Sequence, residues 1–187
     1  MALAAATNEQ RFAALGTPMP APPLRGGVYA PCVRVSNLLY ISGCAPLVPG
    51  RLLAADGITG EGFIRGQVGR DLSTADGALA ARQCGLAVLS ILRAELGSLN
   101  HVRRLVKTTG MVWAVPEFPE QPEVINGFSL LMLEVFGERN GVGARSAVGF
   151  GSLPRNIPVE VDAVFEVEEG APSASLGLPP PPPQAKL

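Results

Sequence analysis

The side chains that most often carry metal or redox chemistry are few in this sequence. Its cysteines, Cys32, Cys44 and Cys84, are odd in number and form no Cys-x-x-Cys pair. That spacing argues against a disulfide framework and against a zinc site. His101 is the one histidine, so a histidine-based metal site is not supported either. A chain with these thiols fits a reducing compartment, and we expect a cytoplasmic protein.

Acidic side chains gather instead on one strand. The run from Val159 to Val167 alternates apolar and polar residues, which is typical of a strand with one buried face. Glu160, Asp162 and Glu166 then share the other face. Glycine-rich segments before Gly69 lack the spacing of a phosphate-binding loop, so no dinucleotide site is predicted.

Composition restricts the class of protein further. The chain has 187 residues, of which 47% are hydrophobic and 17% charged, which suits one domain with extensions. Its net charge of −1 offers no basic surplus for a nucleic acid. No apolar run approaches the ~20 residues that span a bilayer, so no membrane partner is expected. The N-terminus lacks the pattern of a secretory signal, while an organellar transit peptide stays an open alternative.

Periodicity and capping predict the elements that must position the acidic strand. Two short strands form a hairpin about Asn37, and Ser42-Gly43 ends the second of them. A long helix follows, capped by Ser73 or Thr74 and ended by Gly97. The predicted strands are 32–36, 38–41, 102–115, 145–150 and 159–167, and the predicted helices are 75–96 and 123–136.

The order β-β-α-β-α-β-β predicts an α+β fold in which a single sheet carries two helices on one face. The other sheet face then needs a cover, and oligomerisation supplies one.

Three regions are predicted along the chain. Residues 1–26 form an N-terminal helix, with Thr7 and Gln10 as a capping box, and a Pro-rich linker. Residues 27–168 form the domain. Residues 169–187 form a tail whose five prolines favour polyproline II. The tail (from 171) and the glycine-rich loop 55–66 are the candidate contacts for a protein partner.

Several short segments, each weak alone, occur together in an order that resembles the RidA/YjgF (L-PSP endoribonuclease) family over 27–167. They are Gly27-Val-Tyr, Leu39-Tyr-Ile-Ser-Gly with Pro46, Val68-Gly-Arg-Asp-Leu-Ser, Lys107-Thr-Thr, Val124-Ile-Asn, Val135-Phe-Gly, Ala144-Arg-Ser-Ala-Val-Gly, Leu153-Pro and Val159-Glu-Val-Asp-Ala. The N-terminal helix and the run from Gln121 to Gly127 resemble a longer subgroup of that family.

The resemblance implies a chorismate-mutase-like fold and a homotrimer with a central barrel and sites between subunits. It also implies hydrolysis of small carboxylate-bearing enamines or imines, such as 2-aminoacrylate, to a 2-keto acid and ammonia, without a metal or an organic cofactor.

Two residues carry the implied catalysis. By resemblance, Arg145 clamps the substrate carboxylate, which suits the two parallel donors of a guanidinium. Glu160 positions and activates water, as a partly desolvated carboxylate can do near neutral pH.

The resemblance places five further residues around the substrate. Tyr29 and Asn126 line the pocket, and Ser42 and Gly43 form its wall next to Cys44. This sequence departs from the family where Cys44 replaces a frequent glutamine and Ala147 replaces a frequent cysteine. A glycine-rich expansion precedes Gly69.

These departures bear on the substrate more than on the fold. An enamine/imine deaminase is therefore the expected function. The alternatives are a non-catalytic architectural subunit held in a larger assembly by its extensions and, with less support from the charge, an endoribonuclease.

Overall fold

The chain folds into the predicted sequence of strands and helices, with one short helix added. The computed structural model describes residues 5–24, 26–47 and 62–174. The strands are β1 (Cys32–Val35), β2 (Leu38–Cys44), β3 (Val102–Trp113), β4 (Ala144–Phe150) and β5 (Val159–Val167). The helices are α1 (Asn8–Ala14), α2 (Thr74–Leu96), α3 (Gln121–Phe136) and α4 (Glu138–Gly141), with 3₁₀ turns at Leu99–His101 and Pro154–Asn156.

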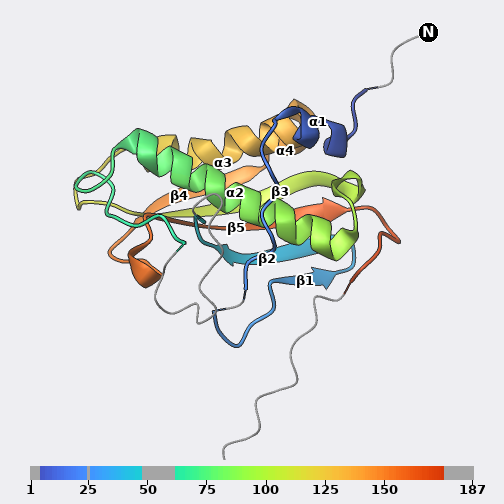
Figure 1. Ribbon diagram of the computed structural model, residues 1–187, viewed down its shortest axis with the longest axis horizontal. Helices are drawn as coiled ribbons and strands as arrows, with labels where there is room; N and C mark the ends of the chain where they lie inside the picture. Colours follow the sequence, from blue (N-terminus) through green and yellow to red (C-terminus); the bar gives the residue numbers. More distant parts are fainter. Residues whose placement is uncertain (1–4, 25, 48–61, 175–187) are drawn as a thin grey trace, which may run out of the picture.

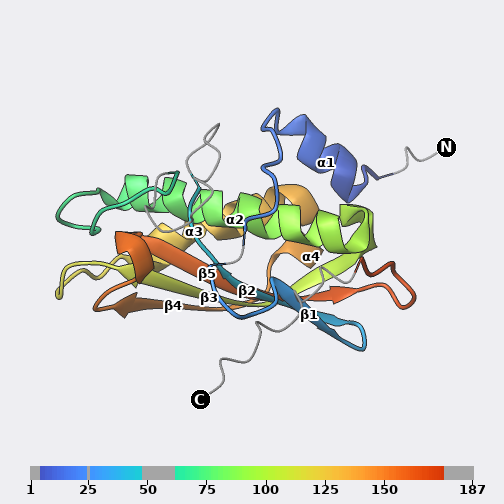
Figure 2. The ribbon, with the colours of Figure 1, turned by 60° about the horizontal axis from the view of Figure 1, so that its bottom comes forward.

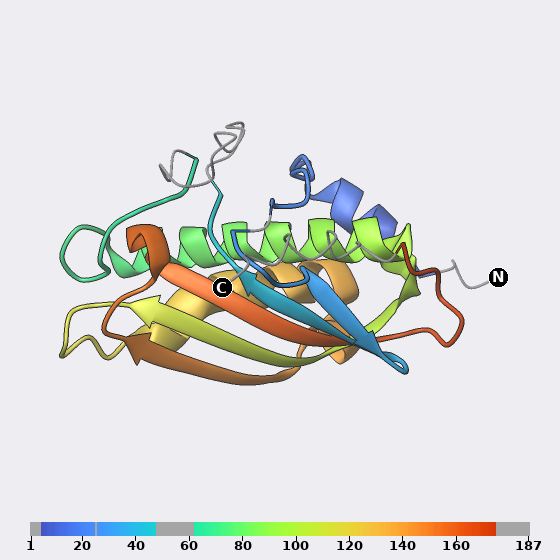
Figure 3. The same ribbon diagram turned by 90° about the horizontal axis from the view of Figure 1, so that it is seen from below.

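All five strands form a single sheet in the order β1-β2-β5-β3-β4. Only the β3–β4 pair is parallel; the other neighbours run antiparallel. Helices α2 and α3 lie side by side on one face of this sheet, as Figures 1 and 2 show, and the view from below in Figure 3 shows the other face without a helix. The predicted α+β architecture is therefore confirmed.

The last strand, β5, is the central strand of the sheet. Its alternation of buried and half-buried residues shows which sheet face packs against the helices. Every second residue of β5 from Val159 to Val167 is buried against the helices, and the residues between them are half-buried. Glu160 and Asp162 therefore point to the face without helices, as predicted.

Helix α2 ends on the predicted residue and begins one residue before the predicted start. Ser73, rather than Thr74, is the N-cap, and its side chain forms a capping box with Asp76. Gly97 ends the helix with a φ of 74°, a conformation that glycine adopts without steric cost. By length and composition α2 is also apolar enough to cross a membrane, but two thirds of its most apolar window is buried inside the domain (67%).

The prediction that Ser42-Gly43 ends the second strand is wrong. Strand β2 continues through both residues to Cys44, which pairs with Val161 of β5. The register shifts between Ile41 and Cys44, so an irregularity, not a turn, explains the Ser-Gly pair.

Both extensions begin in contact with the domain. Thr7 and Gln10 form the predicted capping box of α1, and Phe12 is only 4% exposed, under the guanidinium of Arg93. At the other end, Arg34 of β1 donates hydrogen bonds to the carbonyls of Glu168 and Ala171. The predicted proline tract at 179–183 and most of the predicted 55–66 loop lie outside the described residues.

The close packing of α2 on α3 yields a first testable prediction. A Cβ added to Gly127 of α3 would lie 1.8 Å from the carbonyl oxygen of Ala78 in α2. Gly127→Ala should therefore lower the free energy of unfolding by about 2 kcal/mol or more, even after the ~1 kcal/mol that alanine gains as a helix former. Urea denaturation measures the change. In the control Gly151→Ala, the new Cβ meets nothing within 4 Å; equal stability of the two variants would contradict the packing.

Candidate active site

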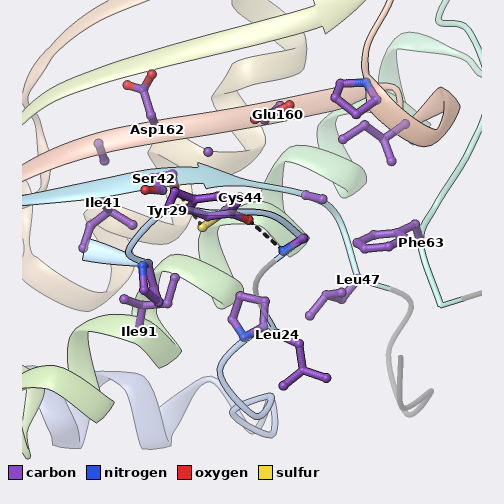
Figure 4. Close-up of a pocket in the computed structure, with 18 of the residues that line it drawn as sticks. Leu24, Tyr29, Ile41, Ser42, Cys44, Leu47, Phe63, Ile91, Glu160 and Asp162 are labelled. Carbon is purple, nitrogen blue, oxygen red and sulfur yellow. Dashed lines mark hydrogen bonds between the residues drawn. The ribbon is translucent and has the colours of Figure 1, made fainter. Parts of the chain in front are cut away.

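Five of the seven predicted site residues line one cleft of about 820 Å³. They are Tyr29, Ser42, Gly43, Cys44 and Glu160. Figure 4 labels all of them except Gly43. The cleft lies between the segment before β1, the irregular end of β2, the first residues of β5 and the turn that precedes β5.

Glu160 is the titratable group best placed for chemistry in this cleft. Burial raises its pKa above the ordinary glutamate value, and the negative charge of Asp162, two residues along the same face of β5, raises it further. A carboxylate of this kind is a stronger base than a solvated one, which suits a general base.

Gly43 creates the space that Glu160 occupies. A Cβ on Gly43 would lie 2.0 Å from Oε1 of Glu160, well inside van der Waals contact. Any other residue would push the carboxyl group out of its position over β2. The absence of a side chain at Gly43 and the register shift beside it therefore act together to admit the carboxyl group.

Ser42 and Tyr29 fix the chain segment that forms the opposite wall. The hydroxyl of Ser42 donates to the carbonyl of Ala30 at 2.7 Å, and its amide donates to the carbonyl of Pro31 at 2.9 Å. The hydroxyl of Tyr29 accepts a hydrogen bond from the amide of Gly26 at 3.2 Å, as Figure 4 shows. Ser42 is thus a positioning residue for the wall, and the ring of Tyr29 faces the cleft.

Cys44 lines the cleft as a neutral thiol. It is 2% exposed, and burial raises its pKa to about 12, with smaller contributions from the charges of Glu160 and Asp162. Such a thiol is not ionised near neutral pH and is a poor nucleophile. Cys32 and Cys84 are buried free thiols as well.

Arg145 and Asn126 lie away from this cleft. Nη1 of Arg145 donates to Oδ1 of Asn126 at 2.8 Å and to the hydroxyl of Ser129 at 3.1 Å. Ser129 was not predicted, although its spacing of three residues from Asn126 on a helix places both side chains on one face. The guanidinium is exposed and makes no ion pair within the described part of the chain.

The sheet separates Arg145 from Glu160. Arg145 pairs with Thr108 of β3, whereas Glu160 pairs with Met111 on the other side of β3. Two strand spacings and three residue positions put their Cα atoms roughly 14 Å apart. Because Thr108 and Met111 are an odd number of residues apart, the side chains of Arg145 and Glu160 also emerge on opposite faces. One chain alone therefore does not bring the two together.

The cleft also holds a cation that was not predicted. Arg155, in the turn before β5, lines it together with Phe63. Only its position in a loop between two strands could have drawn attention to it. Across residues 5–24, 26–47 and 62–174, no group of three or more His, Cys, Asp or Glu side chains is arranged to hold a metal ion.

Known proteins are similar to this chain in sequence and in fold. No family model matches it. Protein TCP17 of Trypanosoma cruzi is 47% identical over 106 residues, which are 57% of this chain and 66% of that relative.

Two crystal structures match over nearly their whole length. A protein of unknown function from Agrobacterium tumefaciens, Atu1372, is 40% identical, with a TM-score of 0.72 over 87% of this chain and 94% of its own. An endoribonuclease candidate from Shewanella oneidensis is 27% identical, with a TM-score of 0.77 over 87% of this chain and 100% of its own.

The charge of Asp162 provides the test of the electrostatics at this site. In the wild type, carboxyl-carbon NMR should give Glu160 a pKa above that of a solvated glutamate. Asp162→Asn removes a neighbouring negative charge and should lower that pKa, while the contribution of burial remains and keeps it above the solvated value. Glu134→Gln, on the far side of the helices, serves as the control and should leave the titration unchanged. A pKa of Glu160 that does not respond to Asp162→Asn would contradict this account.

Proposed function

We propose that the chain is a member of the RidA/YjgF family, which its likeness to the Shewanella endoribonuclease candidate supports, and that it is an imine/enamine deaminase. The substrate is a small 2-imino acid or its enamine tautomer, such as 2-aminoacrylate, and the products are a 2-keto acid and ammonia. The observation that carries the proposal is the half-buried Glu160 carboxyl group, with its raised pKa, in the space left by Gly43.

Glu160 performs both proton transfers of the hydrolysis. The enamine first tautomerises to the imine. The carboxylate of Glu160 then takes a proton from a water molecule as the water oxygen bonds to C2 of the imine, and the C=N π electrons move to nitrogen. Glu160 returns this proton to nitrogen, which gives a carbinolamine. In the second half, Glu160 takes the hydroxyl proton and delivers it to nitrogen, the C–N bond breaks, and ammonia leaves as the C=O bond forms.

Arg145 binds the substrate carboxylate from a second copy of the chain. Its exposed guanidinium is already oriented by Asn126 and Ser129, and Arg145 lies on β4, the edge strand of the sheet. Since one chain separates Arg145 from Glu160, the site is complete only where two copies meet. The sheet face without helices exposes Tyr40, Val148 and Phe150, which suits an assembly such as the homotrimer expected for this family.

The endoribonuclease description belongs to the Shewanella protein, and the cleft of this chain favours it less. Glu160 and Asp162 lie two residues apart on the same face of β5 and both line the cleft, and the whole chain has a net charge of −1. A polyanionic RNA strand would be repelled there, whereas one small carboxylate paired with Arg145 would not.

A coupled assay tests the proposed activity. A PLP-dependent dehydratase generates 2-aminoacrylate from serine, and lactate dehydrogenase reports pyruvate. The wild type should accelerate pyruvate release, and Arg145→Ala and Glu160→Gln should each lose at least about 100-fold, which is ~3 kcal/mol of transition-state stabilisation. Because the base must be ionised, the wild-type rate should rise with pH through a pKa above that of ordinary glutamate.

Arg139→Ala, at an exposed position in α4, is the matched control and should retain the wild-type rate. A wild-type protein that releases pyruvate no faster than buffer would refute deamination of this substrate. Retained activity in Glu160→Gln would refute the role given to the carboxylate.

A further inference from the structure

The cleft contains an arginine that the proposed reaction does not use. Arg155 lies in the turn Pro154–Asn156 between β4 and β5, and its side chain lines the same cleft as Glu160. The proposed hydrolysis takes its carboxylate clamp from Arg145 of another copy and its base from Glu160. A second guanidinium within this chain therefore has no task in the hydrolysis of 2-aminoacrylate.

Arg155 is held in place by three features of the fold. Both Arg155 and Asn156 have a φ of 57°, a conformation that residues with side chains seldom adopt outside sites where position matters. The guanidinium carbon lies 5.3 Å from the centroid of the Phe63 ring, within the range of a cation–π contact. On another side, Gly26 gives it room, because a Cβ there would lie 2.9 Å from Nη2.

Among the described residues, the side-chain nitrogens of Arg155 nevertheless have no hydrogen-bond acceptor and no ion-pair partner. By contrast, Arg34 donates to a backbone carbonyl, and Arg82 and Arg93 donate to carboxylates. In the part of the chain that the structure describes, Arg155 has only its contact with Phe63. A half-buried guanidinium normally has an anionic or carbonyl partner, because removing it from water is costly otherwise. Here its donors are available to a ligand in the cleft.

Glu160 is not that partner. Among the described residues no ion pair joins Arg155 to Glu160, and the guanidinium lies on the ring of Phe63 instead. Arg155 and Glu160 thus belong to different parts of the cleft, and its volume of about 820 Å³ is ample for a small molecule between them.

We propose that Arg155 binds a second carboxylate at the distal end of the substrate side chain, so that the preferred substrates are dicarboxylic 2-imino acids. The inference rests on the proposed deaminase function and specifies its substrate class. A carboxylate matches the two parallel donors of one guanidinium. A phosphate dianion fits less well, because a single arginine faces it and Glu160 and Asp162 add negative charge to the same cleft.

Binding of unreactive keto acids tests the subsite without catalysis. The probes are 2-oxoglutarate and 2-oxopentanoate, which differ only in that a methyl group replaces the distal carboxylate. By calorimetry, the wild type should bind 2-oxoglutarate at least about 10-fold more tightly. Arg155→Gln should remove this preference and leave the affinity for 2-oxopentanoate unchanged. Arg155→Lys should restore part of it, and the exposed control Arg139→Gln should change neither affinity.

Three results would overturn the inference: equal binding of the two probes by the wild type, no binding of either, or an equal loss of both in Arg155→Gln. The last would make Arg155 a clamp for the carboxylate that both probes share. Unfolding midpoints of the variants should match the wild type, which separates a lost contact from a lost fold.

A kinetic arm separates this inference from the proposed function. Amino-acid oxidases generate 2-iminoglutarate from glutamate and 2-iminopentanoate from norvaline, and imine decay is followed with and without the protein. Faster decay of both imines with no effect of Arg155→Gln would support the deaminase and refute the subsite. Arg155-dependent binding of 2-oxoglutarate without faster decay of either imine would support the subsite and refute the deaminase.

Discussion

The contact between Glu160 and Gly43 is the constraint on which the candidate site depends. A carboxyl group can lie over a neighbouring strand only where that strand carries no side chain, and Gly43 meets this need on β2. The place of Glu160 is in turn fixed by β5, the central strand, whose alternate residues are buried under α2 and α3. The same packing that forms the core therefore directs Glu160 away from the helices, into a partly desolvated position where its pKa rises.

The carboxyl group of Glu160 and the guanidinium of Arg145 lie in two different regions of the surface. Glu160, the proposed base, lies in the cleft beside β2, whereas Arg145 lies at the β4 edge, oriented by two residues of α3. A cation close to Glu160 in the isolated chain would lower the pKa on which its basicity depends. Under the proposal that Arg145 acts from another copy, no guanidinium of the described residues pairs with Glu160 within one chain.

Much of the fold follows from local patterns. The alternation of β5 and the capping residues Ser73 and Gly97 correctly predict the elements and their packing, because burial and hydrogen bonding at those positions are local requirements. The prediction at Ser42-Gly43 was wrong because a serine–glycine pair is typical of a turn. The pairing with β5 shows that the pair is an irregularity within a strand. Arg155 could not be predicted as a cleft residue, since its position depends on Phe63 and Gly26, which are distant in sequence.

The central claim is that the site is shared between copies of the chain, and subunit complementation tests it most directly. Arg145→Ala and Glu160→Gln are each expected to be inactive, and the two are unfolded together and refolded as mixed oligomers. If each site takes Arg145 from one copy and Glu160 from its neighbour, random mixing at equal amounts should restore about one quarter of the wild-type rate with 2-aminoacrylate. Mixed oligomers that remain as inactive as either parent would contradict a shared site.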